Sequence, residues 1–431
     1  MGNGNGRTDV EIKHCLNTGK LTRSFKGLAA DDTNRRVSSL FGGIVGGTGG
    51  GSKDKGYTGS FLIEDCFNSG LITSEREKDG IGGVIGTATG KTAEGTPTVT
   101  VKNSYCSESS CERVIGGKNP DTVAIDVNRL PDEMVTGAEA YFYTALNFKQ
   151  YWTALDGKTP VLKMFAAGKG KALAVSGERV DTSWFKPGKK EFTIKTAAQL
   201  YGFTMLAYSG EKFEGVTIKL GADIVMNSGS ASEWAEGKNV PARSWTPIKN
   251  FAGTFDGQGH TISGLYGFKT GVHEKRGGLG LFTDTKETAT IQNVSIANTY
   301  FESTYANGVG AVAARSVGTF KNIYVGSDVY IKNKVCGAVG GLIGIVTKDT
   351  YVENCWSAAN VTSAGQEIGG IIGNGNAMKV TVKHCLFTGT LTRNFEGHED
   401  GLKLYDYEKY PSYYKKCTEV GAYLGGIIGR T

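Results

Sequence analysis

Few side chains in this chain of 431 residues could transfer protons, because it contains only five histidines. Asp256 and His260 flank a Gly-Gln-Gly segment, and such a pair could act as general acid and base. The glycines are more typical of a tight turn between strands. His273 and His398 are each followed by glutamate but lack the HExxH spacing of zinc peptidases. We therefore assign no catalytic residue and predict that the protein is not an enzyme.

Cysteine is the other reactive side chain. None of the eight cysteines forms a CxxC pair, so the spacing indicates neither a zinc site nor a thioredoxin-like centre. Cys106 and Cys111 are five residues apart and could close a short disulfide loop in a secreted protein. Asp31, Asp32 and Asp54 lack calcium-loop spacing. No metal or cofactor is therefore expected.

The composition favours a glycine-rich β protein. The chain has 64 glycines and 8 prolines, without the strict three-residue period of collagen. Glycine inside a helix costs ~1 kcal/mol relative to alanine, which argues against long helices. No apolar run reaches the ~18 residues of a membrane span. The net charge of +6 is mild and its residues are scattered, so no nucleic-acid partner is expected.

A short glycine phrase, Gly-Gly-apolar-apolar-Gly, recurs along the chain. Its copies start at Gly42, Gly82, Gly340, Gly369 and Gly425. Strand-like phrases follow most copies, and each contains a central polar residue. In the second half these residues are Asn293, Asn322, Asn354 and His384, spaced by 29, 32 and 30 residues. A period of this size without intervening helix patterns predicts an all-β solenoid, a parallel β-helix.

The same alignment explains most cysteines. The residue after the polar one is Val, Ile or Cys in six of the seven copies, as in Val294, Ile323 and Cys355. Free cysteine behaves as a small buried hydrophobe, so this position is interpreted as an inward slot rather than a metal or catalytic site. The preceding polar residues are expected to face outward or into a turn, with His14 and His384 as ordinary surface residues.

The repeats divide the chain into two part-domains. Residues 1–165 are expected to be the C-terminal part of one β-helix domain, and residues 190–431 the N-terminal part of the next. The Gly/Lys-rich residues 166–189 are interpreted as a linker. Residues 130–165 are expected to fold over the last coil as a cap. Thr196 and Gln199 form a capping-box pattern that predicts a short helix over the next solenoid.

A longer repeat suggests a tandem array. The phrase VEIKHCLNTGKLTRSF from Val10 recurs as VTVKHCLFTGTLTRNF from Val380. We expect from this alignment that Met1 lies inside a longer natural chain. The second copy carries a longer loop, which holds five tyrosines that could contact a ligand or pack on the solenoid: Tyr405, Tyr407, Tyr410, Tyr413 and Tyr414.

The phrases TIKTAAQLYGFTMLAYSGEKFEGVTIKLGADI and WTPIKNFAGTFDGQGHTISGLY, followed by the glycine phrases, resemble bacterial cell-surface proteins with GLUG motifs. Gly341-Leu-Ile-Gly344 matches the motif. The resemblance implies a right-handed parallel β-helix and an extracellular location. Such repeats occur in adhesin-like proteins and beside the peptidase domain of some IgA proteases.

Three functions remain open at this point. The first is a non-enzymatic stalk, fibre or adhesin whose domains stack end to end and contact a host or cell-surface protein or glycan. The second is a β-helix that binds or cleaves polysaccharide. The third is an accessory domain of a secreted metallopeptidase.

Overall fold

The computed structural model describes residues 3–4, 9–29, 39–48, 60–76, 79–88, 99–118, 122–269, 278–304, 308–335, 337–399 and 423–431. The chain divides into two compact units, Met1–Val180 (unit 1) and Asp181–Thr431 (unit 2). Strands dominate both units and helices are few and short, so the predicted all-β class is confirmed. Each unit is described by itself.

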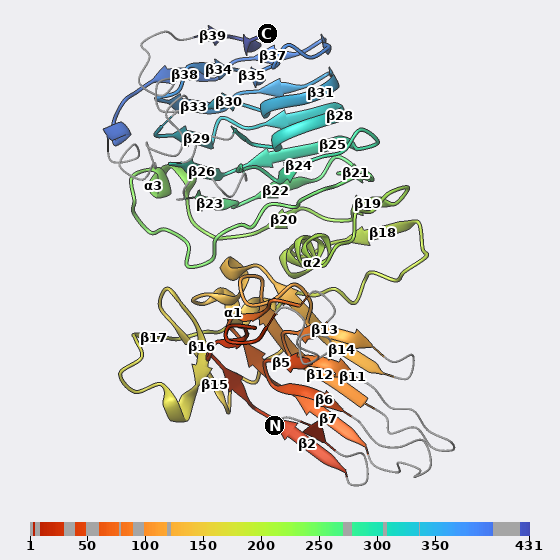
Figure 1. Cartoon of the computed structure of the whole chain (residues 1–431). Helices are drawn as coiled ribbons and strands as arrows, with labels where there is room; N and C mark the ends of the chain where they lie inside the picture. The colour runs from red at the N-terminus through yellow and green to blue at the C-terminus, as the bar shows by residue number, and fades with distance from the viewer. Residues whose placement is uncertain are drawn as a thin grey trace. The chain divides into compact units, whose positions relative to one another are not determined.

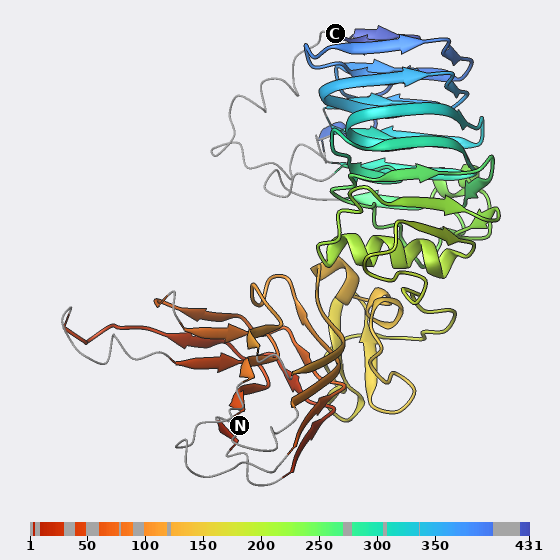
Figure 2. The same cartoon turned by 90° about the vertical axis from the view of Figure 1, so that its right-hand side faces the viewer.

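Unit 2 is built from parallel strands that lie one above another (Figures 1 and 2). The described strands form three sheets. The largest has the main order β18 (Glu191–Ile194), β19 (Thr217–Leu220), β21 (Thr254–Asp256), β25 (Thr290–Ala297), β28 (Ala313–Val325), β31 (Ile343–Glu353), β35 (Ile372–Asn374) and β40 (Ile428–Arg430). Branches of the same sheet are β20 (Ile224–Val225), β22 (Thr261–Ser263), β24 (Phe282–Asp284), β32 (Trp356–Ser357), β36 (Val380–Lys383) and β37 (Leu386–Phe387).

Two smaller parallel sheets complete unit 2. One runs β23 (Tyr266–Lys269), β26 (Thr299–Ser303), β29 (Val329–Asn333), β33 (Asn360–Ser363) and β38 (Thr390–Arg393). The other runs β27 (Val309–Gly310), β30 (Ala338–Gly340), β34 (Glu367–Gly369) and β39 (Tyr423–Gly425).

In these sheets, residues that pair across neighbouring strands lie one sequence repeat apart. Lys321 in β28 lies opposite Gln292 of β25 on one side and Glu353 of β31 on the other. Glu353 in turn lies opposite Lys383 of β36. Each residue therefore pairs with its counterpart one repeat away, and equivalent side chains form columns across the strands.

Unit 1 repeats this arrangement with other strands. One parallel sheet contains β2 (Val10–Lys13), β3 (Leu16–Asn17), β7 (Phe61–Glu64), β8 (Phe67–Asn68), β12 (Val99–Ser107) and β14 (Val123–Leu130). A second contains β1 (Asn3–Gly4), β6 (Val45–Thr48), β11 (Ile85–Ala88) and β13 (Ile115–Lys118). Two parallel pairs join β5 (Leu40–Gly42) to β10 (Gly80–Gly82), and β4 (Leu21–Arg23) to β9 (Ile72–Ser74).

The central polar residue of each repeat occupies a left-handed backbone conformation. Its φ lies between 45° and 55° in all seven aligned copies: His14, Asp65, Asn103, Asn293, Asn322, Asn354 and His384. Asn, Asp and His are enriched at positive φ, which explains the residue types found there. Asp126 in β14 has a φ of 49° and extends the same column, so unit 1 contains a further copy that the sequence alignment missed.

The residue after this turn points into the core. Cys66 of unit 1 is buried. Val294, Ile323 and Cys355, which occupy the equivalent position in unit 2, are buried too. The predicted inward slot is confirmed for these four residues. Cys15 and Cys385 lie in the outermost described copies and are half-buried, because each has a neighbouring repeat on one side only within the described residues.

The helix α2 (Ala197–Tyr208) covers the first strands of unit 2. Thr196 Oγ1 accepts the Gln199 amide at 3.2 Å, and Gln199 Oε1 accepts the Lys195 amide at 2.8 Å. The predicted helix start is therefore confirmed. Phe203 on α2 packs against core rings of the first repeats, with centroids 4.7–6.4 Å away: Phe213, Phe251, Phe255 and Phe282. The short helix α3 (Ala231–Ala235) packs beside β26.

The segment that follows β14 contacts several repeats of unit 1, and its role as a cap over the last coil stays a prediction. It contains η2 (Asp132–Val135), α1 (Glu139–Tyr143) and a hairpin of β15 (Trp152–Leu155) and β16 (Lys158–Leu162). The Trp152 ring contacts Phe67 of β8 edge-on at 6.4 Å. Asp65 of the left-handed column accepts two hydrogen bonds from this segment, as described below.

Residues 166–189, interpreted as a linker, carry ordered contacts of their own. The strand β17 (Ala172–Leu173) pairs antiparallel with β15. Trp184 and Phe185 pack on Phe192 of β18, with centroids 5.5 and 5.0 Å away. The short helix η3 (Lys163–Phe165) precedes this segment.

Candidate functional site

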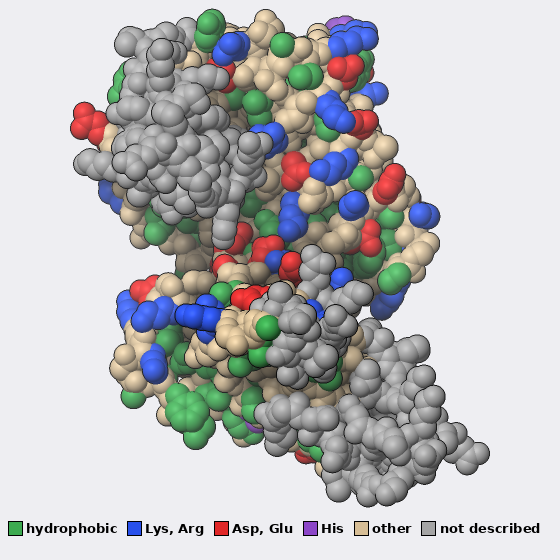
Figure 3. Space-filling model, viewed as in Figure 1, with side chains coloured by type: hydrophobic (Ala, Val, Ile, Leu, Met, Phe, Trp, Pro, Cys, Tyr) green, Lys and Arg blue, Asp and Glu red, His purple; other side chains and the backbone are tan. Residues whose placement is uncertain are grey.

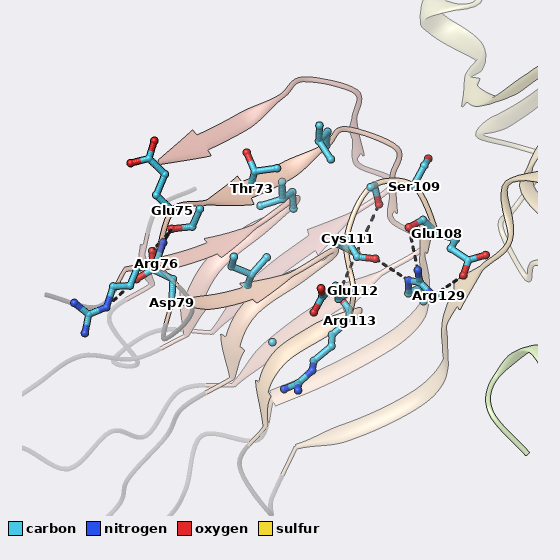
Figure 4. Close-up of a pocket in the computed structure, with 16 residues that line it drawn as sticks. Thr73, Glu75, Arg76, Asp79, Glu108, Ser109, Cys111, Glu112, Arg113 and Arg129 are labelled. Atoms are coloured by element: carbon cyan, nitrogen blue, oxygen red, sulfur yellow. Dashed lines mark hydrogen bonds and ion pairs between the residues drawn. The ribbon is translucent and has the colours of Figure 1, made fainter. Parts of the chain in front are cut away.

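Unit 1 contains a cavity of about 600 Å³ beside the ends of β9 and β12 (Figure 4). One wall comes from β9 and the turn after it, and the other from the loop between β12 and β13. The charged lining residues are Glu75, Arg76, Asp79, Glu108, Glu112, Arg113 and Arg129.

Asp79 is fixed on the first wall. Its carboxylate accepts hydrogen bonds from the Ser74 hydroxyl at 2.6 Å, the Ser39 amide at 2.8 Å and Arg23 at 2.8 and 2.9 Å. Burial acts to raise the pKa of Asp79, but these hydrogen bonds outweigh it and hold the pKa below its usual range. Asp79 is therefore a structural hydrogen-bond acceptor that joins Ser74, Ser39 and Arg23.

Arg129 organises the opposite wall (Figure 4). Its Nε donates to the Cys111 carbonyl at 2.7 Å and its Nη1 to Glu108 Oε1 at 3.0 Å. These contacts hold the loop after β12 against β14. Sequence reasoning missed this wall and Asp79 because Arg23 and Asp79, or Glu108 and Arg129, are distant in sequence and carry no motif.

The thiols of Cys106 and Cys111 meet at this loop. Their Sγ atoms are 2.9 Å apart, and both cysteines are buried and form no disulfide in the structure. The hydrogen bond between them raises the pKa of the Cys106 thiol and lowers that of Cys111, with Arg129 adding to the second effect. A disulfide needs S–S contact at about 2.05 Å, so a small shift would join the two atoms. The pairing proposed from the sequence stays a prediction.

Oxidation of this pair is expected when the protein is kept without reductant. The lowered pKa makes Cys111 the attacking thiolate at a lower pH than an ordinary cysteine, and oxidised glutathione would serve as the oxidant. Mass spectrometry of the tryptic peptide 103–113 should show a species lighter by two hydrogens. The variant Cys106→Ala should instead leave Cys111 free to react with iodoacetamide. Two alkylated thiols in the wild type after incubation with oxidised glutathione would contradict the prediction.

Asp65 anchors a second polar cluster in unit 1. Its buried carboxylate accepts from His14 Nδ1 at 2.6 Å, Trp152 Nε1 at 2.9 Å and the Asn147 amide at 2.8 Å. The Tyr151 ring stacks on His14 at 3.6 Å. His14 is therefore not an ordinary surface residue, because the segment after β14 covers it. With its oxygens engaged by three donors, Asp65 is a structural acceptor.

The Asp256/His260 pair considered from the sequence does not form. His260 Nδ1 contacts Asp223 at 3.1 Å, while Asp256 accepts from Asn293 and Gln292 at 3.0 and 2.9 Å. The turn between the two residues instead includes Gln258 and Gly259 at positive φ, as the glycine pattern indicated.

The tyrosines proposed for binding lie outside the described residues: Tyr405, Tyr407, Tyr410, Tyr413 and Tyr414. Within the described ranges, no three His, Cys, Asp or Glu side chains gather as a metal site requires. The helices of that part of the chain are also too short or too polar to cross a membrane. Basic and acidic side chains are interspersed on the face of unit 2 shown in Figure 3.

Comparison with known proteins found a sequence relative and a solved structure. The chain is 31% identical to halomucin of Haloquadratum walsbyi over 146 residues, which is 33% of this chain but 2% of that relative. No family model matches, so the GLUG assignment stays a prediction. A crystal structure from Bacteroides ovatus, provisionally described as an immunoglobulin A1 protease, aligns with 49% of this chain and 79% of its own. Its TM-score of 0.27 and identity of 20% are too low to support a conclusion.

Proposed function

We propose that this chain is a non-enzymatic extracellular protein, a structural or adhesive part of a bacterial surface protein, built from two right-handed parallel β-helices. The repeat-long parallel register supports the β-helix, since crossover connections between parallel strands are nearly always right-handed. The resemblance to GLUG-motif surface proteins and the similarity to halomucin over 146 residues support the location. The engaged carboxylates of Asp65 and Asp79 favour a role without catalysis.

The observation that carries the assembly role is the strand edge that β39 and β40 form in unit 2. Within the described residues, β34 pairs with strands on both sides, while β39 and β40 pair on one side only. Gly370 is covered: a Cβ there would lie 2.1 Å from the Gly426 carbonyl oxygen. Gly426 is the equivalent glycine of the last phrase, and a Cβ there meets nothing within 4 Å.

An exposed row of backbone donors and acceptors can accept another strand. The repeat at the start of unit 1 has a matching edge, because β2 pairs only with β7 among the described strands. The similar sequences from Val10 and Val380 make the two edges alike in register. End-to-end addition of one chain to another is therefore the proposed mode of assembly.

The variant Gly426→Ala tests this assembly. Its added methyl group should leave the isolated chain intact but obstruct an incoming strand, as a Cβ at Gly370 would. Sedimentation velocity over a wide concentration range should show association of the wild type and a loss of at least tenfold in the variant. Gly375→Ala is the control, because its Cβ has only ordinary contacts at 3.4 Å or more. Wild type that stays monomeric throughout, or equal association of both variants, would rule the assembly out.

A further inference from the structure

A row of asparagine amides follows the outside of unit 2. Asn322 Nδ2 donates to Asn293 Oδ1 at 2.9 Å, and Asn354 Nδ2 donates to Asn322 Oδ1 at 3.2 Å. Each amide nitrogen carries two N–H groups, and the row uses one of them. Asn322 and Asn354 therefore each have a second N–H that the row does not use. The amides thus present donors at the strand spacing of about 4.8 Å.

An aromatic surface lies beside this row. Tyr324 and Trp356 occupy the same column two residues further along their strands, and their ring centroids are 4.8 Å apart. Trp356 is 44% exposed, although most large aromatic side chains of unit 2 are buried. Its Nε1 donates to Thr388 Oγ1 at 2.8 Å, which holds the indole in place.

The amides and rings share a shallow depression of about 610 Å³. Its lining also includes Gln258, Gly259 and Ser295, and none of the lining residues is charged. This absence is informative because the chain as a whole is 21% charged. The ligand that fits is uncharged, extended across the strands along the row, and both polar and apolar.

We propose that this surface binds a neutral linear glycan. A pyranose ring offers an apolar C–H face that can lie on Trp356 and hydroxyl edges that can bond the amides of Asn322 and Asn354. A nucleic acid would need basic side chains for its phosphates, and the lining has none. The inference rests on the proposed extracellular role and names the class of partner for it.

The experiment is titration calorimetry with cellohexaose and mannohexaose as neutral probes and a heparin hexasaccharide as the charged one. The wild type should bind at least one neutral probe and not the heparin fragment. Trp356→Ala should weaken that binding at least tenfold, while Trp356→Phe keeps part of it. Phe395→Ala is the matched control, since Phe395 is 50% exposed elsewhere in unit 2.

No binding of either neutral probe at millimolar concentration, binding of heparin alone, or unchanged affinity in Trp356→Ala would overturn the inference. The melting curve of Trp356→Ala should match the wild type, because the ring is partly exposed. Sedimentation of the same samples separates the two proposals. A wild type that associates but binds no neutral glycan rejects the glycan site alone, and a wild type that binds glycan but stays monomeric rejects the assembly alone.

Discussion

Gly341→Ala is expected to destabilise unit 2 by about 3 kcal/mol, the upper range for overpacking a core. Gly341 is the second glycine of its phrase, and a Cβ there would lie 2.2 Å from the Gly370 carbonyl oxygen and 2.3 Å from Ser357 Oγ. Backbone atoms of the next repeat cannot move aside without breaking the strand pairing. Hydrogen–deuterium exchange in β28 and β31 should therefore rise strongly.

Gly426→Ala is the matched control, since it makes the same substitution at the same position of an uncovered phrase. At low protein concentration its exchange and melting should follow the wild type. Equal destabilisation by the two substitutions would mean that the cost arises within each glycine phrase, and not from contact between repeats.

Asp65→Ala is expected to destabilise unit 1 by about 3 kcal/mol. The change leaves the buried Trp152 indole N–H and the Asn147 amide without their acceptor, at roughly 1–3 kcal/mol for each buried group. It also places alanine at a φ of 55°, where aspartate and asparagine are better tolerated. Asp65→Asn should destabilise unit 1 less, because asparagine tolerates the positive φ at this position as aspartate does.

Hydrogen–deuterium exchange of the backbone amides in β7, β12 and β15 would measure this loss of stability. So would the unfolding transition followed by tryptophan fluorescence. Asp223→Ala is the control, because Asp223 also contacts a histidine, His260, but is exposed to solvent. Surface ion pairs contribute little, so no measurable change is expected there. A loss in Asp65→Ala no larger than in Asp223→Ala would show that the buried cluster contributes nothing to unit 1.

The repeat could be predicted because stacking makes each residue meet its own counterpart. The spacing of Asn293, Asn322 and Asn354 anticipated the strand register, and the alternation of Cys355 with Ile323 and Val294 anticipated the buried slot. The helix α2 could likewise be predicted from Thr196 and Gln199, because a capping box is a local interaction.

Contacts outside the repeat could not be predicted from the sequence. The position of Trp152 against the side of unit 1 depends on Asp65, 87 residues earlier. The copy at Asp126 was missed because its apolar residues Val123 and Ile125 are exposed and pair with the polar residues Thr100 and Lys102. Only its φ and pairing reveal it. The tyrosine loop remains a prediction, as its residues lie outside the described part.

The sequence by itself determined the β class, the repeat length and which residue of each repeat faces the core, because these follow from periodic spacing and local backbone preference. The tertiary structure decided which columns of side chains cooperate. It placed an uncharged row of amides beside Trp356, joined His14 to Asp65 under the segment after β14, and brought Arg129 to the Cys111 loop. These arrangements depend on contacts between strands or segments far apart in the chain, and no single stretch of sequence encodes them.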